Sequence, residues 1–151
     1  MENETISSTI TRKALLEGRV QRANAYLDHF FIITGELTKG SEKCRELGFS
    51  TLKLVVEETE KIVPKDGVYA IGVESEGRRL RGMLNVKTKD ENAKPDIQVH
   101  VFDYYSEFIL ENKYATITFH KRMRDELNID NSKKLKDQLE IDKKEIEELI
   151  Y

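Results

Sequence analysis

The sequence is poor in residues that cross-link, bend or break a chain. It has one cysteine, two prolines and no tryptophan among its 151 residues. The single Cys44 excludes an internal disulfide, and with it a secreted scaffold held together by such bridges. No run approaches the about 18 apolar residues that a membrane span needs, and Met1–Ser8 lacks the basic and apolar regions of a signal peptide. These absences predict a cytoplasmic protein with no membrane partner.

Neither sign of charge dominates the chain. The 25 lysines and arginines oppose 28 acidic residues, which gives a formal net charge of −3. A charge-rich but nearly neutral surface gives no general attraction to nucleic acid, so we expect no such partner. The three histidines lack the spacing of a zinc site, and neither GxxxxGK[ST] nor GxGxxG is present. The length suits one domain with a core of its own.

The middle of the chain is rich in β-branched and aromatic residues. Six runs of this kind are separated by turn residues, and Glu76-Gly77 is typical of a tight hairpin. In the fifth run Ile97, Val99 and Val101 alternate with more polar residues, which predicts one buried face. The predicted strands are Phe30–Thr38, Phe49–Val56, Val68–Ser75, Arg79–Lys87, Asp96–Tyr104 and Tyr114–His120. Six strands at this spacing predict a mainly β protein, an antiparallel barrel or sandwich.

Helical patterns lie at both ends of the chain. From Ser8 to Leu27 apolar residues recur at helical spacing, and because Gly18 weakens the middle, the prediction is one helix or a pair of short helices. The hydroxyls from Ser7 to Thr9 are candidate caps for its start. From Ser132 to Ile150 one apolar stripe predicts a helix packed on the outside of the barrel. The stripe consists of Leu135, Leu139, Ile146 and Leu149 or Ile150.

One connection between strands differs in composition from the others. The segment Lys39–Leu54 contains Gly40, Gly48 and Arg45, and a hydroxyl that leads directly into a strand. The backbone N–H groups of such a loop can hold phosphate, with the hydroxyl on a metal ion. On composition alone, a plain connection between strands is the simpler interpretation.

Taken in their order along the chain, these segments resemble riboflavin kinase. More narrowly, they resemble the C-terminal kinase module of the bacterial bifunctional riboflavin kinase/FAD synthetases. The similar segments are Gly40–Thr51, Asp66–Ala70, Gly82–Asn85, Val99–Asp103 and Lys121–Glu126. The resemblance covers about Asp28 to Ile150 and implies a six-stranded antiparallel Greek-key barrel with a flanking helix. It also implies MgATP and riboflavin as substrates and FMN as product.

The first residues resemble the end of the other module of those proteins. Ile6–Arg12 is similar to the element that closes the adenylyltransferase module, and the residues up to Leu27 look like the linker helices that follow it. The resemblance therefore implies two parts. Residues 1–28 are a helical remnant after a missing module, and residues 29–151 are the kinase-like barrel with its C-terminal helix. An upstream FMN adenylyltransferase module is the expected partner.

Carried over residue by residue, the family's motifs give an expected site. Its nucleotide and phosphate side falls on Gly40, Arg45, Gly48, Thr51 and Lys53. Its flavin side falls on Asn85, Arg122 and Arg124. The resemblance places the catalytic positions at Gln98 and Thr51, and it leaves Thr51 as the residue for Mg²⁺.

Two of these positions depart from the family's pattern. Lys53 replaces the asparagine of the metal site, and an ammonium has no lone pair for Mg²⁺ and repels it. Gln98 replaces the catalytic glutamate, and the loss of a general base costs about 10²–10⁴ in rate. We therefore expect weak or lost kinase activity, with ATP, Mg²⁺ and riboflavin used if the chain is active. The alternative is a non-catalytic flavin-binding, nucleotide-binding or assembly module on the same fold.

Overall fold

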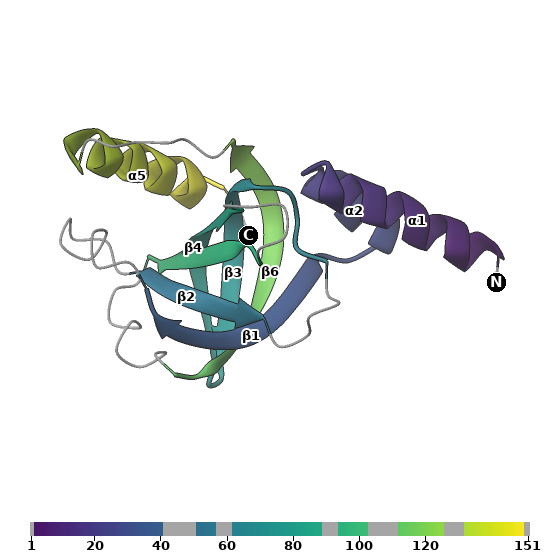
Figure 1. Ribbon diagram of the computed structural model, residues 1–151, viewed down its shortest axis with the longest axis horizontal. Coiled ribbons are helices and arrows are strands. Elements are labelled where there is room, and N and C mark those ends of the chain that lie inside the picture. The colour runs from purple at the N-terminus through teal and green to yellow at the C-terminus, as the bar shows by residue number, and fades with distance from the viewer. Residues whose placement is uncertain are drawn as a thin grey trace.

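The computed structural model describes residues 2–40, 51–56, 62–88, 94–102, 112–125 and 132–149. Helices α1 (Glu2–Leu16) and α2 (Val20–Leu27) come first, and α5 (Ser132–Glu147) comes last. The strands between them are β1 (Phe31–Lys39), β2 (Thr51–Val56), β3 (Gly67–Ser75), β4 (Arg78–Lys87), β5 (Asp96–Val101) and β6 (Tyr114–Arg124). The strands wrap into a barrel, with α5 on one side and α1 and α2 on another (Figure 1).

The strands close into one antiparallel barrel in the order β1-β2-β5-β4-β3-β6. Three consecutive strands, β3 to β5, lie side by side, and β6 returns beside β3, which makes a Greek key. Closure pairs each of these strands on both sides, so none of them presents an open sheet edge. The predicted mainly β, six-stranded antiparallel barrel is confirmed, and a sandwich is excluded.

Alternate strand positions fill the inside of the barrel with apolar side chains. The predicted buried face of β5 is confirmed, because Ile97, Val99 and Val101 all belong to the main core. Toward one end of the barrel the rings of Tyr69 and Phe119 meet edge to face, with their centroids 5.3 Å apart. The intervening positions project from the outside of the barrel, where the candidate site lies.

Strand β6 is longer than the sequence predicts. The expected end at His120 is wrong, because pairing with β3 continues to Arg124. The register of β6 shifts twice along β3, between Ala70 and Ile71 and between Val68 and Tyr69. Such bulges break the alternation by which a strand is recognised in a sequence.

The N-terminal segment forms two helices, one of the two expected arrangements. Gly18, with φ at +81°, separates them, and glycine adopts this backbone conformation at little steric cost. Helix α1 begins at Glu2, so the expected cap at Ser7 to Thr9 is wrong and these residues lie within the helix. The helices share the core of the barrel through Ala14, Leu15, Val20 and Ala23.

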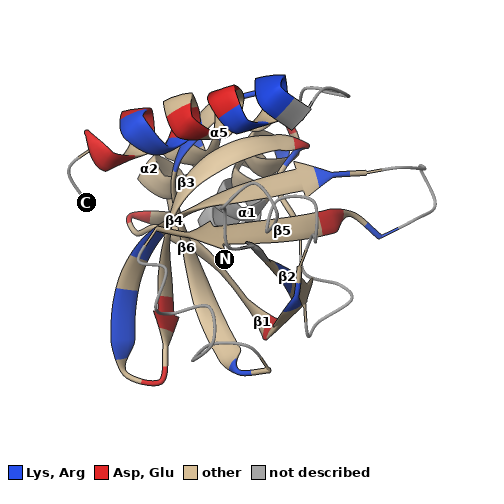
Figure 2. Cartoon of the chain, turned by 90° about the vertical axis from the view of Figure 1, so that its left-hand side faces the viewer, with Lys and Arg blue, Asp and Glu red and all other residues tan. Residues whose placement is uncertain are grey.

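Helix α5 packs on the outside of the barrel, as predicted. The apolar cluster beneath it contains Val68, Ala70, Met83, Phe102, Met123, Leu139, Ile146 and Leu149. Leu135 of the expected stripe is half-buried and lies outside this cluster. Asp142 is buried within the stripe, between Leu139 and Ile146. The remaining surface of the helix carries alternating basic and acidic residues (Figure 2).

Candidate functional site

Most of the described site residues fall on one row that crosses the outside of the barrel. Cross-strand pairing places Lys53 beside Gln98, and Gln98 beside Asn85. The row continues through Val68 to Arg124, next to α5. Paired residues of neighbouring antiparallel strands project on the same side, with their Cβ atoms about 4.5–5.5 Å apart. The barrel therefore brings residues that the resemblance assigns to nucleotide binding, catalysis and flavin binding into one line. This line, Lys53, Gln98, Asn85, Val68 and Arg124, is called the amide row below.

Two buried oxygens at the centre of the amide row find no hydrogen-bond donor among the described residues. They are Oε1 of Gln98 and Oδ1 of Asn85, and no residue in the described ranges donates to either. The amide nitrogen of Gln98 fixes the orientation of this side chain, because Nε2 donates to Oδ1 of Asp96 at 2.9 Å. An unsatisfied buried acceptor costs about 1–3 kcal/mol, so two adjacent ones mark a place where a ligand's donors would be stabilised.

Lys53 adds a positive charge to the same row. Its side chain is exposed, and its backbone carbonyl accepts a 3.4 Å hydrogen bond from Oγ1 of Thr38. An ammonium cannot ligate Mg²⁺, so position 53 does not fit the metal role that the family implies for it. Across the described part of the chain, no group of three or more His, Cys, Asp or Glu could hold a metal ion. The charge of Lys53 instead suits a phosphate.

The rest of the expected phosphate side is only partly described. Thr51 pairs with His100, one row away from Lys53. Gly40 directly follows β1, at the edge of residues 41–50. Arg45 and Gly48 lie outside the described residues, as does Cys44. Their contacts with phosphate stay predictions.

Arg122 lies on the inner side of β6, away from the amide row. It pairs with the buried Tyr69, and its guanidinium donates to the Asp66 carbonyl at 2.7 Å and to the Asp125 carboxylate at 2.8 Å. This hydrogen bond and the charge of Arg122 lower the pKa of Asp125. Burial raises the pKa of Tyr69. These contacts tie Arg122 to the end of the barrel and do not bring it beside Asn85.

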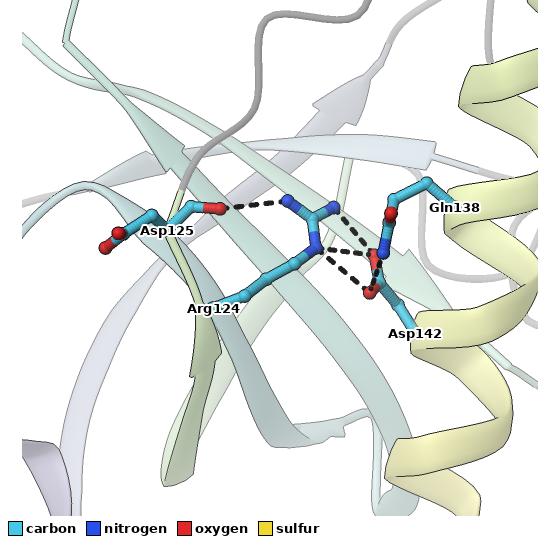
Figure 3. Close-up of polar contacts among 4 residues, drawn as sticks. All are labelled: Arg124, Asp125, Gln138 and Asp142. Carbon is cyan, nitrogen blue, oxygen red and sulfur yellow. Dashed lines mark hydrogen bonds and ion pairs between the residues drawn. The ribbon is translucent and has the colours of Figure 1, made fainter.

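Arg124 stands on the amide row, but its guanidinium faces α5. Its Nε lies 3.0 Å from Oδ1 of Asp142, and its Nη2 lies 2.7 Å from Oδ2 (Figure 3). Gln138 also donates to Oδ1 of Asp142, at 2.9 Å. The side chain of Asp142 is 1% exposed and that of Arg124 is 22% exposed. In this structure Arg124 therefore holds α5 against the barrel, at the end of the amide row.

Sequence reasoning missed two carboxylates that position site residues. Asp142 had a signal, since an acid stands in the apolar stripe of α5 between Leu139 and Ile146. Asp96, which orients Gln98, had none, because an acid after a proline is ordinary turn chemistry.

Together, the closed barrel, the flanking helix and the amide row define a small β-barrel domain with a candidate ligand-binding face. The family model of riboflavin kinase matches residues 27–150. The chain therefore belongs to the riboflavin kinase family.

Similar proteins agree with this assignment. The bifunctional riboflavin kinase/FMN adenylyltransferases of Bacillus subtilis and Listeria monocytogenes are each 32% identical over 95% of this chain. The Escherichia coli protein of the same name is 30% identical over 89% of it. The first two alignments cover 46% of the relative, so this chain spans about half the length of the curated relatives it matches.

A solved structure is also similar, and it carries a different description. It is described as a macrolide-efflux protein from Streptococcus pneumoniae. The TM-score is 0.88 at 26% identity, over 95% of this chain and 47% of the other. Among the described residues of the present chain, no helix has the length and apolar character that crossing a membrane requires.

Proposed function

We propose that this chain is a riboflavin kinase domain of low activity. It transfers the γ-phosphoryl group of ATP to the ribityl 5′-hydroxyl of riboflavin, which gives FMN and ADP. Family membership supports the substrates. The observation that carries the low activity is the amide row, where the neutral Gln98 stands between Asn85 and Lys53.

The amide row suits positioning better than proton transfer. Phosphoryl transfer has a loose transition state, so catalysis depends mainly on alignment and on stabilisation of charge. Oε1 of Gln98 would accept a hydrogen bond from the 5′-hydroxyl and orient its oxygen toward the γ-phosphorus. As the new O–P bond forms and the bond to ADP breaks, the hydroxyl proton leaves to water or to the transferred phosphoryl group, because an amide does not take it. Lys53 would stabilise phosphate charge.

Mg²⁺ enters this proposal as a part of the MgATP substrate. The Lys53 ammonium cannot ligate the ion, and no step above depends on a metal ion held by the protein. Bound to ATP, Mg²⁺ supplies charge neutralisation at the phosphates.

The direct test is incubation with riboflavin, ATP and Mg²⁺, with FMN separated from riboflavin by chromatography. We expect slow formation of FMN that depends on the protein. A folded protein that forms no FMN above the protein-free control would contradict the proposal and leave the non-catalytic alternative.

Restoring the missing groups tests the chemical reason for the low activity. Gln98→Glu together with Lys53→Asn is expected to raise the turnover number by about 10²–10⁴, the range for general-base catalysis. The new carboxylate would lie beside Asp96, where like charges raise its pKa. Adding Asp96→Asn removes that repulsion and keeps the hydrogen bond between the two side chains, with residue 96 now donating and the new carboxylate at position 98 accepting. Gln98→Ala is the matched control that removes the acceptor. No gain in either restored protein would refute this explanation.

A non-catalytic nucleotide-binding module is the second candidate, and the position of Lys53 favours it. An ammonium in place of a metal ligand can hold phosphate without a metal ion. This candidate predicts that ATP or FMN binds equally well with Mg²⁺ and with a chelator, and that Lys53→Ala weakens binding. Binding that strictly requires Mg²⁺ would exclude it.

We also propose an FMN adenylyltransferase module upstream as the partner in the natural protein. The combined names of the relatives and the 46% share of their length that aligns support this. On this proposal residues 1–28 are the linker and residues 29–151 the kinase domain, and mass spectrometry of the natural protein tests it. A cytoplasmic location stays a prediction.

A further inference from the structure

A groove outside the amide row lies between α2, the β3–β4 hairpin, β6 and the end of α5. Its volume is about 700 Å³, within the range of about 300–1,000 Å³ typical of small-molecule sites. Gly72 forms part of its floor, where the missing side chain leaves a gap between Arg81 on β4 and Thr118 on β6, its two register partners. A Cβ at Gly72 would lie 3.3 Å from Nε2 of His120, so a larger side chain there would fill the gap.

A β-bulge directs two consecutive side chains of β6 into this groove. In a regular strand His120 and Lys121 would face opposite sides of the sheet. Strand β3 pairs Ile71 with Phe119 and Ala70 with Lys121, so His120 is the extra residue. His120 and Lys121 both line the groove as a result. Bulges that redirect side chains in this way are frequent next to functional sites.

The groove combines an excess of positive charge with an aromatic wall. Among the described residues that line it, the charged side chains are three bases and one acid, Arg79, Arg81, Lys121 and Glu74. Phe30 is 47% exposed, and its ring packs edge-on against His120 with a centroid distance of 4.4 Å. Burial lowers the pKa of His120, so the ring is neutral at pH 7 and adds hydrogen-bonding capacity but no charge.

We propose that this groove binds a phosphate monoester attached to an aromatic ring system. The phosphate would lie against Arg81 and Lys121, since guanidinium and ammonium groups are the usual side-chain partners of phosphate. The Arg81 guanidinium is already held at this end of α5, where Nη1 donates to the Glu147 carbonyl at 3.4 Å. The aromatic part would pack on Phe30. FMN and AMP both have this chemistry and are the two sources to be distinguished.

Equilibrium dialysis in the absence of ATP tests the proposal with FMN, AMP and riboflavin. The test proteins are the double variant Arg81→Gln/Lys121→Gln and the groove-filling variant Gly72→Val. Lys113→Gln, at an exposed lysine outside the groove, is the matched control. Lys53→Ala reports binding at the amide row. Because no turnover is measured, a kinase that proves inactive leaves the result standing.

We expect the charge variant to lose about tenfold or more of its affinity for FMN or AMP, the size of one charge-assisted hydrogen bond. It should bind riboflavin, which has no phosphate, unchanged. A loss for FMN alone assigns a flavin phosphate, a loss for AMP alone assigns a nucleotide, and a loss for both assigns the shared group. Unchanged affinity for both ligands, or an equal loss for riboflavin, overturns the proposal. If Gly72→Val does not fold, the charge variant decides alone.

Discussion

The ion pair between Arg124 and Asp142 is predicted to contribute strongly to the docking of α5. Truncating Arg124→Ala would leave a carboxylate that is 1% exposed without its cation. Breaking a buried pair in this way costs about 3–5 kcal/mol. Because the Arg124 side chain is 22% exposed, water compensates part of this cost. We therefore expect Arg124→Ala to lower the free energy of unfolding by about 3 kcal/mol.

Two further variants separate the charge from the packing. Asp142→Asn keeps the shape and an acceptor for Gln138, so we expect a smaller loss of about 1–3 kcal/mol. Replacing both partners, as Arg124→Met with Asp142→Leu, removes the buried charges together and is expected to stay within about 1 kcal/mol of the parent protein. The double variant would then be more stable than Arg124→Ala.

Urea denaturation followed by circular dichroism measures all of these free energies. The exposed Arg22 on α2 gives a matched control, and Arg22→Ala should change stability by less than about 0.5 kcal/mol. If Arg124→Ala and Arg22→Ala were equally mild, the pair would be a surface contact in solution and the reasoning would be refuted. A double variant as unstable as Arg124→Ala would also refute it.

Two more predictions concern glycine and histidine. In Gly77→Ala, at φ +74°, no atom of the described residues lies within 4 Å of the new Cβ, so backbone strain alone should lower the free energy of unfolding by about 1–2 kcal/mol. In Gly18→Ala, at φ +81°, the new Cβ would lie 2.7 Å from Nε of Arg122, so overpacking should lower the free energy of unfolding by about 1–3 kcal/mol more than in Gly77→Ala. Equal urea midpoints for the two variants would contradict this. The lowered pKa of His120 means that the unfolded chain binds its proton first as the pH falls below about 6.5. The free energy of unfolding should therefore fall from pH 7 to pH 5 less steeply in His120→Gln than in the parent protein, and identical slopes would contradict this prediction.

The barrel was predictable because its strands alternate and its turns are marked. On β5, Ile97, Val99 and Val101 face the core as their spacing indicates. Burial of one face fixes this pattern over the length of a strand, so it can be read without knowing the partner strands. The extension of β6 beyond His120 was not predictable, because the bulges depend on the pairing with β3.

The candidate site residues come from motifs in the sequence, and those motifs do not predict what surrounds each residue in the fold. Arg122 and Arg124 are two residues apart on β6, and the resemblance assigns both to the flavin side. In the fold Arg122 pairs with the buried Tyr69, whereas Arg124 pairs with Val68 and meets Asp142 of α5. Their different environments come from a second bulge and from a helix that is distant in the sequence.

Residue type and local spacing were enough to predict the strand-forming segments and the amphipathic helix. The sequence also shows a neutral amide, Gln98, at the position where the family resemblance implies a base. Tertiary structure alone decided that Gln98, Asn85 and Lys53 form one row and that His120 and Lys121 share one groove. Register between strands far apart in the chain is set by closure of the whole barrel, and no local pattern encodes it.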